Sequence, residues 1–94
     1  AISDPGKSPV YHMSDTAMAV HNMSLVALEY DLGTCWIGIF ENETVKKLFG
    51  IPKKKVLVGA LAVGYPDEEP KERERRSIEE VLYIEKYGKK LSIK

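Results

Sequence analysis

The chain has 94 residues, 44% of them apolar, and its 14 basic and 14 acidic residues cancel to a net charge of zero. This length fits one domain at most, and a domain of this size buries only about 60–65% of the surface that its unfolded chain exposes. The charge balance argues against a nucleic-acid-binding or membrane-surface role, which needs a basic excess, and the single cysteine excludes an internal disulfide and a zinc site built from cysteines.

The first regular element that the sequence predicts is a helix over residues 15–32. Residues 1–13 precede it as a loop, because they hold two prolines, a glycine and the turn signal Asp4-Pro5-Gly6. Ser14 is the expected N-cap of the helix. Gly33 is expected just beyond its C-terminus, in the left-handed conformation that glycine adopts readily.

This predicted helix is apolar around most of its circumference. Only Asp15, Asn22 and Glu29 recur every seven residues, and they make one narrow polar stripe. A helix of this kind is buried on nearly every side, which in so short a chain favours a subunit interface. The long apolar blocks need more cover than the chain supplies, from a partner chain, a missing segment or a bound cofactor.

The stretch Leu32-Gly-Thr-Cys-Trp-Ile-Gly-Ile-Phe40 follows the helix and holds the only tryptophan and the only cysteine of the chain. Residues 35–40 are expected to be extended or looping. Two glycines flank the tryptophan, and glycine weakens regular structure while it permits a close approach of the main chain. The layout predicts a place where main chain, rather than side chains, meets a flat ligand.

A second, short helix is predicted over residues 43–49. Asn42 is its expected cap, and Gly50 with Pro52 is its expected stop. Its inner face is expected to consist of Val45, Leu48 and Phe49.

The apolar run Val56–Tyr65 is predicted to be a strand buried on both faces, since it is continuous and lies between turn signals. Gly59 and Gly64 within it again permit close approach. Residues 77–84 are expected to hold a short helical turn followed by an extended piece. The tail over residues 89–94 either pairs as an edge strand or stays mobile.

The charged run Lys71-Glu-Arg-Glu-Arg-Arg76 admits two interpretations. Most such runs are solvated surface loops. In an extended segment, however, residues i and i+2 point the same way, so Arg73 and Arg75 would project together, with Glu72 and Glu74 turned away. Two guanidinium groups on one side can hold a phosphate dianion through forked hydrogen bonds.

Candidate catalytic side chains are scarce. His12 and His21 have no metal-ligand partner at helical or hairpin spacing, and His21 is expected to make a structural hydrogen bond. Cys35 lies among apolar residues, where a free cysteine usually packs as a small hydrophobe, and a nucleophilic role is the alternative. The sequence has no phosphate-binding glycine motif.

Taken together, these motifs resemble the FMN-dependent nitroreductase family. The string Gly-Thr-Cys-Trp-Ile-Gly, over residues 33–38, is diagnostic of one common branch. The matching strings keep the family's order and spacing along nearly the whole chain, and they are Ser14-Asp-Thr-Ala-Met-Ala19, His21-Asn-Met23, Leu32-Gly-Thr-Cys-Trp-Ile-Gly-Ile-Phe40, Val45-Lys-Lys-Leu-Phe-Gly-Ile-Pro52, Leu61-Ala-Val-Gly-Tyr-Pro66, Glu69-Pro-Lys-Glu-Arg-Glu-Arg-Arg-Ser-Ile-Glu-Glu80 and Tyr87-Gly88.

The resemblance implies an α+β fold with a mixed, mostly antiparallel sheet flanked by helices, of which residues 1–94 would be the C-terminal half. The N-terminal half, with an arginine-rich segment that contacts FMN, would be absent, so this chain alone would be inactive. Family members are intertwined homodimers with two FMN sites at the interface. Residues 15–32 would then form the central interface helix.

The resemblance assigns six residues to FMN, and they are Trp36, Ile37, Gly38, Ile39, Arg73 and Arg75. The first two would line one face of the flavin ring, and the backbone of the next two would meet its N5 and O4 atoms. The two arginines would hold the phosphate, with Arg76 as a weaker third candidate. No catalytic side chain and no metal is implied, because the cofactor carries the chemistry.

The function implied is that of an FMN-dependent NAD(P)H oxidoreductase. NAD(P)H would reduce FMN and leave, and a small-molecule electron acceptor such as a nitroaromatic or a quinone would take its place in a ping-pong cycle. A related flavin-fragmenting or dehalogenating enzyme and a non-catalytic flavin- or nucleotide-binding module are the alternatives. No apolar run reaches about 18 residues and no signal-peptide pattern is visible, so the expected compartment is the cytoplasm, with no membrane or nucleic-acid partner.

Overall fold

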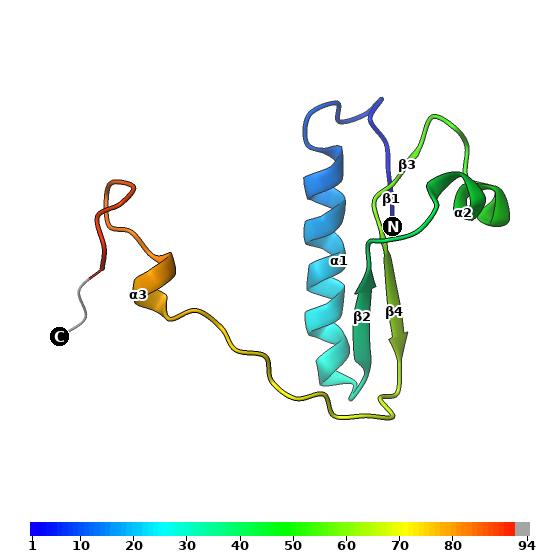
Figure 1. Ribbon diagram of the computed structural model, residues 1–94. Helices are drawn as coiled ribbons and strands as arrows, with labels where there is room; N and C mark the ends of the chain where they lie inside the picture. Colours follow the sequence, from blue (N-terminus) through cyan, green and yellow to red (C-terminus); the bar gives the residue numbers. More distant parts are fainter. Residues whose placement is uncertain (92–94) are drawn as a thin grey trace.

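The computed structural model describes residues 1–91 and has α+β architecture, as the sequence predicts (Figure 1). One long helix runs alongside a pair of strands, and a short helix lies near one end of that pair. An extended segment then leads away from this body to the last helix. The elements are β1 (Ile2–Ser3), α1 (His12–Glu29), β2 (Gly33–Ile37), α2 (Asn42–Phe49), β3 (Val56–Leu57), β4 (Ala60–Gly64) and α3 (Ile78–Val81).

Two antiparallel ladders organise the body. β2 pairs with β4 from Gly33 opposite Gly64 to Ile37 opposite Ala60, and β1 pairs with β3. The strand predicted over residues 56–65 is therefore present as β3 and β4, with a break at residues 58–59. At that break the main chain changes its partner from β1 to β2.

The N-terminal region differs from the predicted loop over residues 1–13. β1 forms there by pairing with β3 (Ile2 opposite Leu57). Its partner lies more than 50 residues away in sequence, so a local sequence pattern does not predict this pairing. α1 begins at His12 rather than at residue 15, and Tyr11 is its N-cap. Ser14 is not the cap, because its hydroxyl donates to the Tyr11 carbonyl at 3.1 Å.

The C-terminus of α1 also differs from the prediction. The left-handed residue is Asp31, with φ 57°, whereas Gly33 opens β2. The Asp31 N–H donates to the Leu28 carbonyl, and the Leu32 N–H donates to the Ala27 carbonyl at 3.1 Å. This is the Schellman arrangement, and aspartate occupies its left-handed position because a short polar side chain tolerates that conformation.

The two short helices keep most of their predicted signals. Gly50 ends α2 in the left-handed conformation (φ 64°), as predicted, but the N-cap is Glu41 and Asn42 is the first helical residue. Leu48 and Phe49 are exposed, so the predicted inner face of α2 is not covered within this chain. Ser77 caps α3 with a reciprocal capping box to Glu80, which confirms the predicted helical turn.

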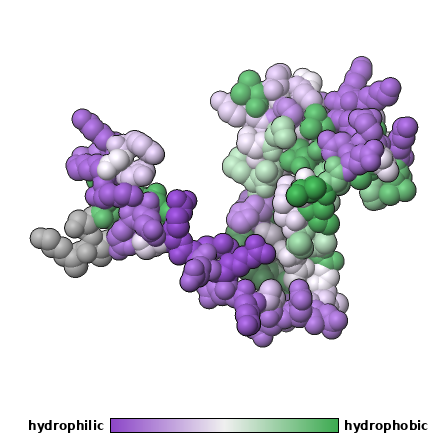
Figure 2. All heavy atoms as spheres, in the orientation of Figure 1, coloured by the Kyte–Doolittle hydropathy of each residue, from purple (hydrophilic) through white to green (hydrophobic). Residues whose placement is uncertain are grey.

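Within the described residues the hydrophobic core is small. Its buried apolar side chains are Val20, Ala27 and Leu57, and the buried Ser3 hydroxyl shares a 2.8 Å hydrogen bond with His12 Nδ1. Apolar surface is exposed over several parts of the body (Figure 2). The expectation that residues 56–65 are buried on both faces is wrong for this chain, because α1 covers one face of the β2–β4 pair and no described element covers the other. No helix within residues 1–91 is long and apolar enough to cross a membrane.

The segment after β4 leaves the body without regular structure as far as Ser77. The radius of gyration is accordingly 17.9 Å, against about 12 Å for a compact domain of this length. Beyond α3, Tyr83 forms a single antiparallel bridge with Lys90, so part of the predicted edge pairing is present. The rest of that predicted strand, residues 92–94, lies outside the described residues.

An ion pair joins the first turn of the chain to the segment before β3. Lys55 Nζ donates to Asp4 Oδ2 at 2.6 Å, and this hydrogen bond lowers the pKa of Asp4 below its usual 3.8. A carboxylate with a lowered pKa stabilises the fold above its usual pKa and loses that contribution as the pH falls through the lowered value. We therefore expect Lys55→Gln to destabilise the assembled protein at about pH 6 and to converge on the wild type as the pH falls through the lowered pKa of Asp4, measured by urea unfolding at a series of pH values.

Candidate functional site

The end of β2 and the turn after it form what we call the Trp36 wall, defined as residues 36–39. Trp36 and Ile37 are the last residues of β2, and Gly38 and Ile39 follow without regular structure. The wall is accessible to solvent, since Trp36 is 46% exposed and Ile39 97% exposed. Four of the six predicted FMN-binding residues are thus consecutive and exposed, although the side chains of Trp36 and Ile37 lie on opposite faces of β2.

The position of the indole within this wall follows from the β2–β4 register. Trp36 pairs with Leu61, and because side chains alternate along a strand, both lie on the face that α1 covers. A cavity of about 170 Å³ opens beside the indole and is lined by Ala17, Val20, His21, Ser24, Trp36 and Leu61. The sequence did not indicate this cavity, because it depends on how α1 crosses the ladder.

Main chain is accessible at Gly38. A Cβ atom at this position would lie 3.2 Å from Trp36 Nε1, so the glycine lets the turn pass close to the edge of the indole. With no side chain at Gly38 and an outward-pointing Ile39, the peptide groups of this turn are open to a planar ligand. That main chain meets a flat ring here stays a prediction.

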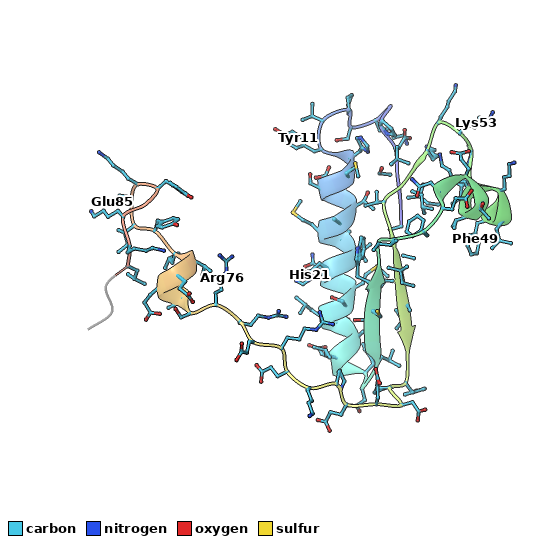
Figure 3. The ribbon with its side chains drawn as sticks, in the orientation of Figure 1. Tyr11, His21, Phe49, Lys53, Arg76 and Glu85 are labelled. Atoms are coloured by element: carbon cyan, nitrogen blue, oxygen red, sulfur yellow. The ribbon has the colours of Figure 1, made fainter. Side chains whose placement is uncertain are left out.

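The structure does not bring Arg73 and Arg75 to the Trp36 wall of the same chain. Both are exposed on the segment between β4 and α3, which in Figure 3 leads away from the body with Arg76 near its far end. Within residues 1–91 the ion pairs are Lys55–Asp4 and Lys89–Glu85, so neither arginine is held by a carboxylate. No ladder fixes this segment, and the common direction predicted for the two side chains stays a prediction.

The remaining candidate side chains have different surroundings from those expected. Cys35 is exposed rather than buried, because it lies on the face of β2 that faces away from α1 and that no described element covers. The structural hydrogen bond expected of His21 is made by His12 instead, to Ser3. The imidazole of His21 is exposed beside the cavity next to Trp36.

Comparison with known proteins places this chain in a family. The model of the nitroreductase family matches residues 2–65. The chain is 31% identical over 72 residues to "Putative NADH dehydrogenase/NAD(P)H nitroreductase" of Methanothermobacter thermautotrophicus, a match that covers 72% of this chain and 38% of that protein. It is 33% identical over 52 residues to 5,6-dimethylbenzimidazole synthase of Rhodospirillum rubrum, which covers 55% of this chain and 25% of that protein.

Among solved structures, the crystal structure of a nitroreductase family protein from Clostridium novyi NT is similar, with a TM-score of 0.68 and 28% sequence identity. The match covers 95% of this chain and 50% of that one, so the whole described fold has a counterpart in about half of a longer chain. The chain likewise spans less than two fifths of each of the curated relatives named above.

Proposed function

Because this chain belongs to the nitroreductase family, as the match over residues 2–65 shows, we propose that it is part of an FMN-dependent NAD(P)H oxidoreductase. The observation that carries the proposal is the Trp36 wall, where an exposed indole edge adjoins open main chain at Gly38. When bound, FMN would supply the ring that takes hydride from NAD(P)H and passes electrons to an acceptor.

The roles we propose for this chain are binding and orientation. Trp36 and Ile37 would pack on one face of the flavin ring, and the main chain of Gly38 and Ile39 would lie along its N5–O4 edge. The opposite ring face would stay open, so that NAD(P)H and a nitroaromatic or quinone acceptor use it in turn, as a ping-pong cycle requires. Arg73 and Arg75 would hold the phosphate, and their guanidinium groups, which have no ion-pair partner among residues 1–91, suit that role.

A single copy of these 94 residues provides only one side of such a site, so we propose two partners. One is the N-terminal half of the same fold, since the similar solved structure is about twice as long as the matched region. The other is a second copy of the protein, packed against α1. The support for it is that α1 exposes large apolar side chains, which are Met13, Met18, Met23, Leu25, Val26 and Leu28.

A second candidate function is the flavin-fragmenting or dehalogenating reaction left open by the sequence, for which the similarity to a protein named 5,6-dimethylbenzimidazole synthase is weak support. A third candidate is a flavin-binding module without activity.

The experiment that separates these functions uses the natural assembly that contains this chain. We expect the purified assembly to be yellow, to lose its flavin absorbance on anaerobic addition of NADH or NADPH, and to regain it with a nitroaromatic or quinone. An assembly that contains the first half but no flavin contradicts every enzymatic candidate. Bound flavin whose absorbance does not change with either nucleotide would support the flavin-binding module without activity. Flavin that is consumed rather than recovered would support the second candidate.

A further inference from the structure

The indole of Trp36 lies directly against Gly59, at the break between β3 and β4. A Cβ atom built on Gly59 would come within 2.7 Å of Cη2 and 3.0 Å of Cε2, and closer still to Cζ2. Carbon atoms in van der Waals contact lie about 3.5–4.0 Å apart. No side chain larger than hydrogen therefore fits at position 59 while the indole keeps its place.

The backbone at Gly59 cannot easily recede to relieve such a clash. Gly59 is buried, its carbonyl accepts a hydrogen bond from the main-chain nitrogen of Ala1, and the adjacent Val58 N–H donates to the Ala1 carbonyl at 3.0 Å. The atoms that a new Cβ would meet belong to the far end of the Trp36 side chain. The indole is thus the part that moves, because rotating one side chain costs less than breaking two main-chain hydrogen bonds.

Conformational freedom does not explain the glycine at position 59. Its φ lies outside the left-handed region, in contrast to Gly50 and Gly88. Gly64, the last residue of β4, also has an ordinary φ, and a Cβ atom there would have no neighbour within 4 Å. Neither position requires a left-handed backbone, so the two differ in what a side chain would meet.

We propose that Gly59 is a positioning residue: because it has no side chain, it sets where the Trp36 indole lies relative to the rest of the Trp36 wall. The indole lies against Gly59 along its six-membered ring and adjoins Gly38 at Nε1. Any side chain at position 59 displaces the indole away from Gly59 and toward the solvent-exposed side of the Trp36 wall. This inference rests on the proposed function, in that the displaced ring would then occupy space required by the flavin.

The test compares Gly59→Ala with Gly64→Ala in the assembled protein. We expect Gly59→Ala to raise the Kd for FMN by about 10-fold or more, since small misplacements of a binding group are costly, and to shift the potential of the bound flavin. Gly64→Ala is expected to change the Kd less than about 2-fold, because it fills open space. In the background of Trp36→Phe, whose smaller ring lacks the clashing atoms, Gly59→Ala is expected to cause no further loss.

Equal Kd values for Gly59→Ala and Gly64→Ala would overturn the inference, as would an undiminished effect of Gly59→Ala in the Trp36→Phe background. If Gly59→Ala does not fold, recovery of folding in Gly59→Ala/Trp36→Phe supports the clash, and failure of both variants overturns it in favour of a backbone role. If the wild type binds no FMN, the proposed function fails while the inference is still tested. The Trp36 emission, assigned by difference from Trp36→Phe, must then shift in Gly59→Ala and not in Gly64→Ala.

Discussion

Replacing Arg73 and Arg75 together with alanine is expected to weaken FMN binding to the assembled protein by about 3–6 kcal/mol, because each hydrogen bond to a charged group contributes about 1.5–3 kcal/mol. Both side chains are exposed and neither has a carboxylate partner within residues 1–91, so the substitution removes no ion pair of this chain. The fold of the body should therefore survive. Titration of the apoprotein with FMN, followed by flavin fluorescence, measures the effect.

Two controls separate a phosphate contact from a general effect of charge. Riboflavin lacks the phosphate, so its affinity should change little between the wild type and the double variant. Lys53→Ala/Lys54→Ala removes the same number of positive charges from an exposed turn and should leave FMN binding unchanged. If the double variant binds FMN as tightly as the wild type, residues 71–76 are a solvated surface loop, which is what most charged runs of this kind are.

Local patterns in the sequence predict much of the secondary structure. The stop of α2 at Gly50 and the helical turn at Ser77 depend on neighbours within a few positions, and the structure confirms both. The strand predicted over residues 56–65 is confirmed in part, as β3 and β4 with a break at residues 58–59. The errors at β1 and at the start of α1 arise where residues distant in sequence determine the structure. β1 forms only because β3 is available, and the start of α1 moves to His12 next to the contact between His12 and Ser3.

Burial was less predictable than secondary structure, because an apolar pattern shows that a surface needs cover without showing what supplies it. Cys35 and Val63 are residue types that usually lie in a hydrophobic core, yet both are exposed in the described part of this chain. The same reasoning applies to the site. The string around Trp36 predicted a place where main chain meets a flat ligand, and this stays a prediction, because the close approach that the structure has is between Gly38 and Gly59 and the Trp36 indole itself. The relation between this wall and the arginines cannot follow from a segment that leaves the body.

Introducing charge on the exposed side of α1 is expected to dissociate the proposed dimer. Met18 and Leu25 are seven residues apart, lie on one side of the helix and are 59% and 52% exposed. Met18→Glu/Leu25→Glu would place two carboxylates in an apolar interface, where an unpaired charge costs several kcal/mol, and two-fold symmetry repeats the cost on the partner. Sedimentation equilibrium of the assembled protein should then show half the wild-type mass.

Lys53→Ala/Lys54→Ala is the matched control for net charge, because it lowers the charge by the same two units at an exposed turn outside α1. This variant should keep the wild-type mass, so that net charge is excluded as the cause. If FMN lies at the interface, as we propose, the dissociated variant should also lose its flavin, although its Arg73 and Arg75 are intact. A double variant that remains a dimer would place the second copy elsewhere and leave the apolar side of α1 to be covered by the N-terminal half of the fold.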